Sequence, residues 1–173
     1  MRLLIDCTYF TKGERFIMNA PLTLSSEDQN ELAVKDTIHG YVETEQPLFL
    51  RQMLGDSTAA LLQAYLDAKD ADEDDTEEKD DDLEYLADGL RESFADYVFY
   101  RMLRNVNTLV TTTGVVELKT ANYYRTPADR EASIWNRMVD RNVSFVARLK
   151  ARGVEYAVYY SENMVTKINA LNL

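Results

Sequence analysis

The stretch LEYLADGLRESFADYVFYRMLRNV, residues 83–106, decides the fold predicted for this chain. Six of its apolar residues share one narrow arc when positions are spaced at about 100° per residue: Leu83, Leu86, Leu90, Phe94, Tyr97 and Val98. The spacing predicts a long core helix that ends near Val106. The Thr-Thr-Thr-Gly run at 111–114 breaks this pattern, and the β-branched residues after it favour an extended strand or loop.

A second long helix is predicted over residues 127–152. Thr126 fits its N-cap, Pro127 its first position, and Gly153 its stop. Apolar side chains cover roughly half of the helix circumference. Beside them, five arginines line up within about 60°: Arg130, Arg137, Arg141, Arg148 and Arg152. Two interpretations stay open: a solvated flank whose stems cover apolar neighbours, or a stripe that pairs with acids of another subunit or with phosphates.

The N-terminal half predicts shorter elements. Residues 1–24 hold brief apolar runs around a turn and indicate a β-hairpin or an extended arm. Ser25 and Ser26 suit the start of a helix that reaches about Glu45. Pro47 should interrupt it and open a short apolar helix closed by Gly55. A further helix is expected from residue 56 or 57 to about 66.

The fold class that follows is mainly α. We expect one domain over residues 1–173: a small bundle of four to five helices with an extended N-terminal arm or hairpin (1–24), an inserted loop around 111–125 and an extended C-terminal tail (154–173). The 173 residues, 46% apolar, are enough to bury a core. No run approaches the roughly 20 apolar residues that span a bilayer, and Asp6 interrupts any signal-peptide pattern, so we expect a protein that folds in a cytoplasm.

Acidic residues are concentrated in one segment. The net charge of the chain is −11, and residues 67–82 hold eleven acids against two lysines. Like charges at this density oppose packing, which indicates a solvated loop or a frayed helix extension. Asp70, Asp72 and Asp74 match the first ligands of a calcium loop, but Asp75 replaces its glycine and Asp81 its glutamate, so no metal site is predicted.

The residue inventory disfavours catalysis. Cys7 and His39 are the single cysteine and histidine, so any thiol or hydroxyl nucleophile that relies on an imidazole must use His39. We expect His39 to be a structural or surface residue and Cys7 to be a buried thiol. The six glycines form no phosphate-binding loop. We therefore predict no catalytic residue and no cofactor, and a protein that is not an enzyme.

Eleven tyrosines suggest contact surfaces instead. Tyrosine combines a large apolar ring with a polar tip and is enriched at protein interfaces. Tyr97, Tyr100, Tyr123 and Tyr124 flank the break between the two long helices, and together with the five arginines they are the predicted interface residues. The alternative is that most of them are residues at the edge of the core.

Four short stretches resemble a known family. Residues 45–55 (EQPLFLRQMLG), 96–101 (DYVFYR), 112–116 (TTGVV) and 135–139 (WNRMV) are similar to head–tail connector (adaptor) proteins of tailed phages and prophages, particularly those of Bacteroidetes. The likeness covers most of residues 26–152.

The resemblance implies a structural subunit that forms a ring, commonly of twelve copies, beneath the portal and joins it to the tail. Its partners would be other copies of itself, the portal and tail-completion proteins, with DNA passing through the channel without specific binding. It would reside in the virion and, during assembly, in the host cytoplasm. The alternatives are another virion or neck component, or a small helical adaptor that binds a protein partner.

Overall fold

The computed structural model describes residues 1–25, 27–71, 80–106, 108–111, 114–117, 127–153, 156 and 158–169. Four α-helices form the bundle: α1 (Gln29–Leu54), α2 (Asp56–Ala71), α3 (Asp81–Val106) and α4 (Pro127–Arg152). A two-stranded sheet, β1 (Thr108–Thr111) and β2 (Gly114–Glu117), lies between α3 and α4 in the chain, and 3₁₀ turns η1 (Cys7–Phe10), η2 (Gly13–Arg15) and η3 (Glu162–Val165) lie in the terminal segments. The predicted mainly helical bundle is confirmed.

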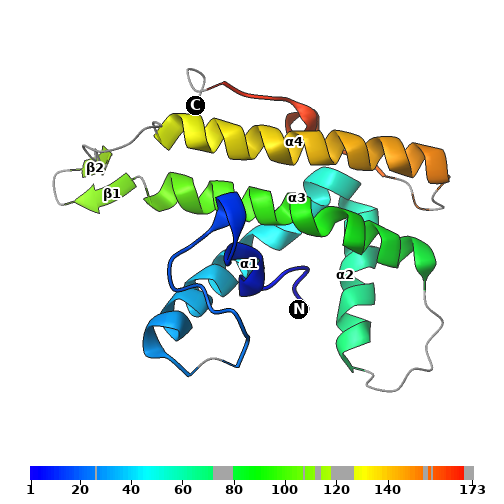
Figure 1. Ribbon diagram of the computed structural model, residues 1–173. Helices are drawn as coiled ribbons and strands as arrows, with labels where there is room; N and C mark the ends of the chain where they lie inside the picture. Colours follow the sequence, from blue (N-terminus) through cyan, green and yellow to red (C-terminus); the bar gives the residue numbers. More distant parts are fainter. Residues whose placement is uncertain are drawn as a thin grey trace.

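Helix α3 is the centre of the molecule. Figure 1 shows α4 lying along one side of α3, with α1 and α2 on the other side. The predicted apolar arc of α3 is buried, and so is every residue from Ser93 to Tyr100. A helix that is covered on several sides needs small or paired polar residues between its large ones, and α3 carries them as Ser93, Ala95 and Asp96.

Aromatic packing joins α1 to α3. The ring centroid of Phe49 lies 5.0 Å from that of Phe94 and 5.4 Å from that of Tyr97. The buried carboxylate of Glu45 accepts a hydrogen bond of 2.8 Å from Nε of Arg101, which satisfies its charge inside the contact. Six residues of the 45–55 stretch are buried and form much of the core face of α1: Glu45, Gln46, Phe49, Leu50, Met53 and Leu54.

The expected break at Pro47 is wrong. Helix α1 continues through Pro47 to Leu54, although proline removes the hydrogen bond to the carbonyl four residues earlier. Pro47 and Glu43 both lie on the exposed face, where water can reach the freed carbonyl. The flanking residues Gln46 and Phe49 are buried and hold the helix in place. The predicted stop at Gly55 is confirmed, with a φ angle of 79°.

The N-terminal segment is an extended arm and not a hairpin. Residues 1–25, all of them described, contain η1 and η2 but no strand. The first residues bond to side chains of the bundle, and the bonds from Tyr9 to Ala20 are local turns within the arm. Gln46 Oε1 accepts a bond of 2.6 Å from the Leu4 N–H, and its Nε2 donates at 2.9 Å to the Arg2 carbonyl. The side chains of Ile5, Cys7 and Phe10 are buried in the core.

The C-terminal tail is extended, as predicted, and contains η3. It packs along α4, where Asn136 makes two bonds of 2.8 Å to the backbone of Ile168 and Trp135 donates at 2.9 Å to the Thr166 carbonyl. Helix α2 extends five residues past its predicted end at Leu66, and the predicted spans of α3 and α4 are confirmed. The N-cap proposed at Thr126 lies outside the described residues.

One glycine sets the distance between α3 and α4. A Cβ atom added at Gly89 would lie 2.6 Å from Cδ2 of Phe145, a fully buried ring of α4. No such neighbour lies within 4 Å of Gly40, an exposed glycine inside α1. The two glycines therefore have different roles.

Gly89→Ala should lower the free energy of unfolding by about 1–3 kcal/mol, because the added methyl group overfills a packed contact. Gly40→Ala should raise it by about 0.5–1 kcal/mol, because alanine is the better helix former. Urea unfolding followed by circular dichroism measures both. Equal effects of the two substitutions would contradict the packing of Phe145 on Gly89.

Candidate interaction site

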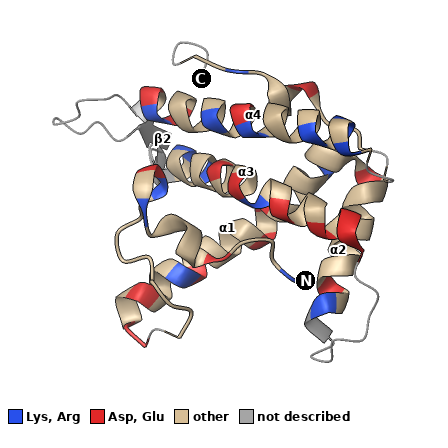
Figure 2. Cartoon of the chain, turned by 45° about the vertical axis from the view of Figure 1, so that its right-hand side comes forward, with Lys and Arg blue, Asp and Glu red and all other residues tan. Residues whose placement is uncertain are grey.

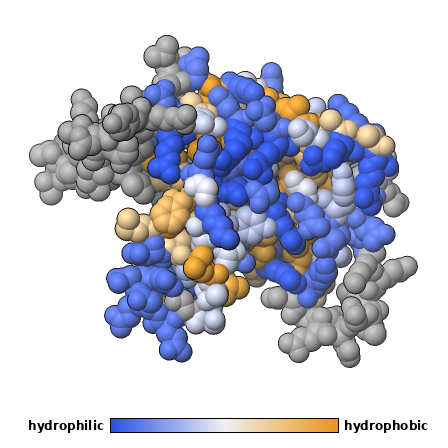
Figure 3. All heavy atoms as spheres, in the orientation of Figure 1, coloured by the Kyte–Doolittle hydropathy of each residue, from blue (hydrophilic) through white to orange (hydrophobic). Residues whose placement is uncertain are grey.

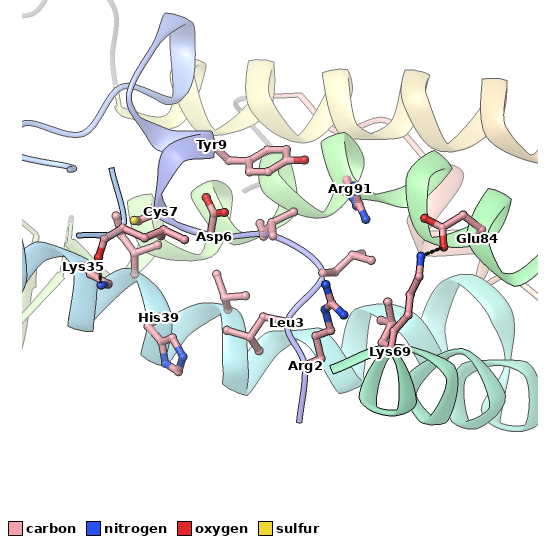
Figure 4. Close-up of a pocket in the computed structure, with 16 residues that line it drawn as sticks. Arg2, Leu3, Asp6, Cys7, Tyr9, Lys35, His39, Lys69, Glu84 and Arg91 are labelled. Carbon is pink, nitrogen blue, oxygen red and sulfur yellow. Dashed lines mark hydrogen bonds and ion pairs between the residues drawn. The ribbon is translucent and has the colours of Figure 1, made fainter. Parts of the chain in front are cut away.

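Cys7 and His39, the residues that a nucleophilic mechanism with an imidazole base would require, line the same pocket. It has a volume of about 490 Å³ and lies between the arm, α1, α2 and α3. Burial first, and the charge of Asp6 second, raises the pKa of Cys7, so its thiol stays protonated and weakly nucleophilic. Figure 4 shows the imidazole of His39 directed away from that thiol. The side chain of His39 is exposed, and its Nδ1 lies 4.0 Å from Oε2 of Glu43. Cys7 and His39 therefore form no nucleophile–base pair.

The polar groups of this pocket hold its walls together (Figure 4). Nζ of Lys69 lies 2.5 Å from Oε2 of Glu84, which also accepts a hydrogen bond of 2.8 Å from Tyr65. The hydrogen bond from Lys69 lowers the pKa of Glu84. Nζ of Lys35 donates at 2.6 Å to the backbone carbonyl of Leu24. These contacts join α2 to α3 and the arm to α1.

A buried carboxylate links the arm to both long helices. Asp96 on α3 is fully buried, and its oxygens lie 3.0 Å from Nη1 of Arg15, 2.5 Å from Nη2 of Arg137 and 3.0 Å from Nε of Arg141. Around it, Glu92 pairs with Arg15 at 2.7 Å and with Arg141 at 2.8 Å. We call these residues, with Glu14, the Asp96 cluster.

The Asp96 cluster balances its own charge. Three arginines face three carboxylates, since Glu14 lies 2.5 Å from Arg137 on the outer side. Burial of Arg137 alone would lower its pKa, but the hydrogen bond and charge of Asp96 outweigh this and raise it. Figure 2 shows basic positions of α4 beside acidic positions of α3 along the pair. The arm is therefore attached by charge-assisted bonds to the most buried part of the fold.

The predicted arginine stripe is largely used within the chain. Arg137 and Arg141 belong to the Asp96 cluster. Arg130 lies over the ring of Phe99, with 5.2 Å from its guanidinium carbon to the centroid, and Arg152 lies over Tyr85 at 4.3 Å. Arg148 has no ion-pair partner among the residues that the structure describes. Reversing the charge of Arg137 or Arg141 would therefore test folding before it tested an interface.

Two of the predicted interface tyrosines are core residues. Burial first, and Glu45 second, raises the pKa of Tyr97 to about 12. The ring of Tyr100 is buried against Trp135 with centroids 4.9 Å apart, and its hydroxyl accepts a bond of 3.0 Å from Arg104. Tyr123 and Tyr124 lie outside the described residues.

The structure exposes an apolar surface on the N-terminal arm that the sequence patterns did not predict. Residues 16–24 of the arm, named here the apolar arm segment, expose four large side chains: Phe16 (54%), Met18 (73%), Leu22 (71%) and Leu24 (53%). Figure 3 shows apolar surface on this lower left side of the molecule. A periodicity search cannot find such a surface, because the segment is neither helix nor strand.

The apolar arm segment is nevertheless fixed to the bundle. The Ile17 N–H donates at 2.9 Å to the Phe10 carbonyl, Pro21 is buried, and Lys35 holds the Leu24 carbonyl. Arg15, just before the segment, is bound in the Asp96 cluster. Exposed apolar side chains on an anchored backbone are typical of a protein-binding surface.

Within the described ranges, no group of three or more His, Cys, Asp or Glu residues is arranged to hold a metal ion. Asp72 and Asp74 and the side chain of Asp70, which resembled a calcium loop, lie outside those ranges. Of the helices that the structure describes, none has the length and apolar character needed to cross a membrane.

Comparison with known proteins places the chain in a family. Residues 50–150 match the family described as "Family of unknown function (DUF6712)", which is more than half of the chain, so the protein belongs to that family. Neither the curated proteins nor the solved structures contain a match. The matched region runs from the end of α1 through most of α4 and contains Asp96, Arg137 and Arg141.

Asp96→Asn should lower the free energy of unfolding by about 3–5 kcal/mol, because it leaves buried arginine charge without a counter-ion. The matched control is Asp140→Asn on the exposed face of α4, where the carboxylate pairs with Lys167 at 2.7 Å. That change should cost no more than about 1 kcal/mol. Denaturant unfolding at pH 7 compares them, and similar losses in both variants would contradict the importance of the buried carboxylate.

Acid should weaken the contacts of Glu92. Burial would raise the pKa of Glu92, but the hydrogen bond and charge of Arg15, with help from Arg141, lower it below 4.5. A carboxyl whose pKa is lower in the folded state stabilises the fold above its unfolded pKa and loses this effect as the pH falls through the folded value. Wild type should therefore exceed Glu92→Gln in unfolding free energy at pH 7, and the gap should narrow progressively as the pH falls below 4.5. A gap that does not narrow in acid would contradict this assignment.

Proposed function

We propose that the protein is a non-catalytic structural subunit of the head–tail junction of a tailed phage, where copies of it form a ring that joins the portal to the tail. It would then reside in the virion and, before assembly, in the host cytoplasm. The resemblance of residues 45–55, 96–101, 112–116 and 135–139 to connector proteins is one support for this proposal. The absence of a nucleophile–base pair in the pocket that holds Cys7 and His39 is compatible with it.

The observation that carries the proposal is the apolar arm segment. Four large apolar side chains stay exposed on a backbone that is tied to α1, α3 and α4, so little ordering entropy remains to be lost on binding. Methionine, phenylalanine and leucine are suited to the buried centre of a protein contact. The net charge of −11 opposes an anionic membrane as the alternative partner.

The Asp96 cluster attaches the start of the apolar arm segment to the bundle. Arg15 donates to Asp96 at 3.0 Å and to the backbone carbonyl of Glu92 at 3.1 Å. Arg130 and Arg137 of α4 contact Glu14 from the other side. A partner that binds the segment therefore binds a surface whose position is set by α3 and α4.

The test is binding to a portal protein encoded in the same genome. The variant with Phe16→Ser, Met18→Ser and Leu22→Ser should bind the purified portal at least about tenfold more weakly, since loss of interface anchors costs 2 kcal/mol or more. Leu61→Ser on α2 and Val143→Ser on α4 are matched controls, because these side chains are 48% and 49% exposed outside the segment.

Surface binding measurements with thermal melting of each variant separate binding from folding. The controls should bind like the wild type, and all variants should melt within a few degrees of it. Wild-type protein that does not bind the portal would overturn the proposed function. Undiminished binding by the triple variant would show that the apolar arm segment is not the contact surface.

A further inference from the structure

The pocket between the arm, α1, α2 and α3 has the size and lining of a small-molecule site. Its volume of about 490 Å³ lies within the range of about 300–1,000 Å³ that is usual for ligand pockets. Such pockets have mainly apolar walls and a few polar groups that converge on one region. The arm, α1 and α2 supply the apolar walls of this pocket: Leu3, Leu4, Ile5, Ile38, Val42 and Leu66.

One polar group of the pocket lining has no acceptor. Nε of Arg91 on α3 is buried and has no hydrogen-bond partner among the residues that the structure describes. Nη1 of the same side chain lies 3.2 Å from Oδ1 of Asp88, three residues earlier on the helix. A buried N–H without an acceptor is costly and rare in native proteins. The unpaired Nε therefore indicates an acceptor that the described chain does not supply.

The charge of the pocket indicates that this acceptor is an anion. Two lysines and two arginines line it against two carboxylates, although the chain as a whole has a net charge of −11. Both carboxylates have partners within the chain, since Asp6 accepts from its own 3₁₀ turn and Glu84 pairs with Lys69. Asp88 offsets part of the charge of Arg91. The remaining excess suits a ligand with a single negative charge.

Donors for such an anion gather where α2 and α3 border the pocket. Figure 4 shows Arg91 on this side with Arg2 and Lys69, and the hydroxyl of Tyr9 is directed toward Arg91. Burial raises the pKa of Tyr9, so its hydroxyl keeps the proton that it can donate. Nε and Nη2 form one edge of a guanidinium, which matches the two oxygens of a carboxylate. The Arg91 side chain is 39% exposed and can turn this edge inward, because Nε has no hydrogen bond to lose.

We propose that this pocket binds a monocarboxylate with a linear apolar chain, of the kind found in medium-chain fatty acids. The carboxylate contacts Arg91 and the hydroxyl of Tyr9, and the apolar chain lies along residues 3–5 of the arm and the facing side of α1. A phosphate monoester fits less well, because it carries up to about two negative charges at neutral pH. The site is independent of the proposed head–tail function.

Titration of the full-length wild type with octanoate, octanol and acetate tests the two parts of the ligand separately. Octanoate should bind with a dissociation constant below about 1 mM. Octanol lacks the charge and acetate lacks the apolar chain, so each should bind at least about tenfold more weakly. Calorimetry measures the affinities, and the amide chemical shifts that octanoate changes should belong to residues that line the pocket.

Arg91→Met removes the guanidinium and keeps an unbranched side chain. This variant should bind octanoate at least about tenfold more weakly and octanol as the wild type does. It should also melt within a few degrees of the wild type, because Nε makes no bond in the ligand-free protein. Arg148→Met is the matched control, since Arg148 is an exposed arginine of α4 outside this pocket, and it should bind all three compounds like the wild type.

Three results would overturn the site. Octanoate that does not bind the wild type, or that binds Arg91→Met equally well, would exclude anion recognition by Arg91. Equal affinities of the wild type for octanoate and octanol would show an apolar cavity without a place for the carboxylate. Shift changes confined to the apolar arm segment would show binding to the surface and not to the pocket. Portal binding is measured separately, so the failure of one proposal is distinguishable from the failure of the other.

Discussion

The buried carboxylate of Asp96 is the constraint on which the rest of the structure depends. A charged group with no solvent exposure is tolerated only when nearby partners compensate for its lost hydration, and Asp96 has three arginines within 3.0 Å. These partners come from two other elements, so satisfying one charge fixes the arm and α4 against α3. The packing of Phe145 on Gly89 sets the distance between α3 and α4. The ion pairs of Asp96 with Arg137 and Arg141 fix how the two helices are oriented against each other.

This constraint connects the core to the surface. Arg15 is bound in the Asp96 cluster one residue before the apolar arm segment begins, so the direction of that segment is determined by a contact with the central helix. Gln46 and Lys35 on α1 hold the chain on either side of it. The exposed apolar side chains are therefore presented by a preorganised backbone, which is what an assembly subunit needs for a specific contact.

Sequence periodicity predicted the two long helices almost to the residue, because Leu83–Val106 and Pro127–Arg152 have regular apolar arcs and clear end signals. Periodicity failed where contacts between distant parts of the chain determine the local structure. Pro47 stays within α1 because the carbonyl that it frees, that of Glu43, lies on the exposed face. The arm forms no hairpin because its first residues bond to Gln46 and the following ones form local turns. The arginine stripe was located correctly on α4, but its partners were not predictable, since Asp96 and Arg137 lie 41 residues apart and meet only in the fold. The exposed apolar segment has no periodic pattern at all.

The central claim is that the apolar arm segment is held in a fixed position before any partner binds. Amide hydrogen exchange of the protein alone measures this directly, because the N–H groups of Ile17 and Ala20 donate to the carbonyls of Phe10 and Ile17. These two amides should exchange at least about 100-fold more slowly than in an unstructured peptide. Exchange of both within seconds, at the rate of free chain, would contradict it.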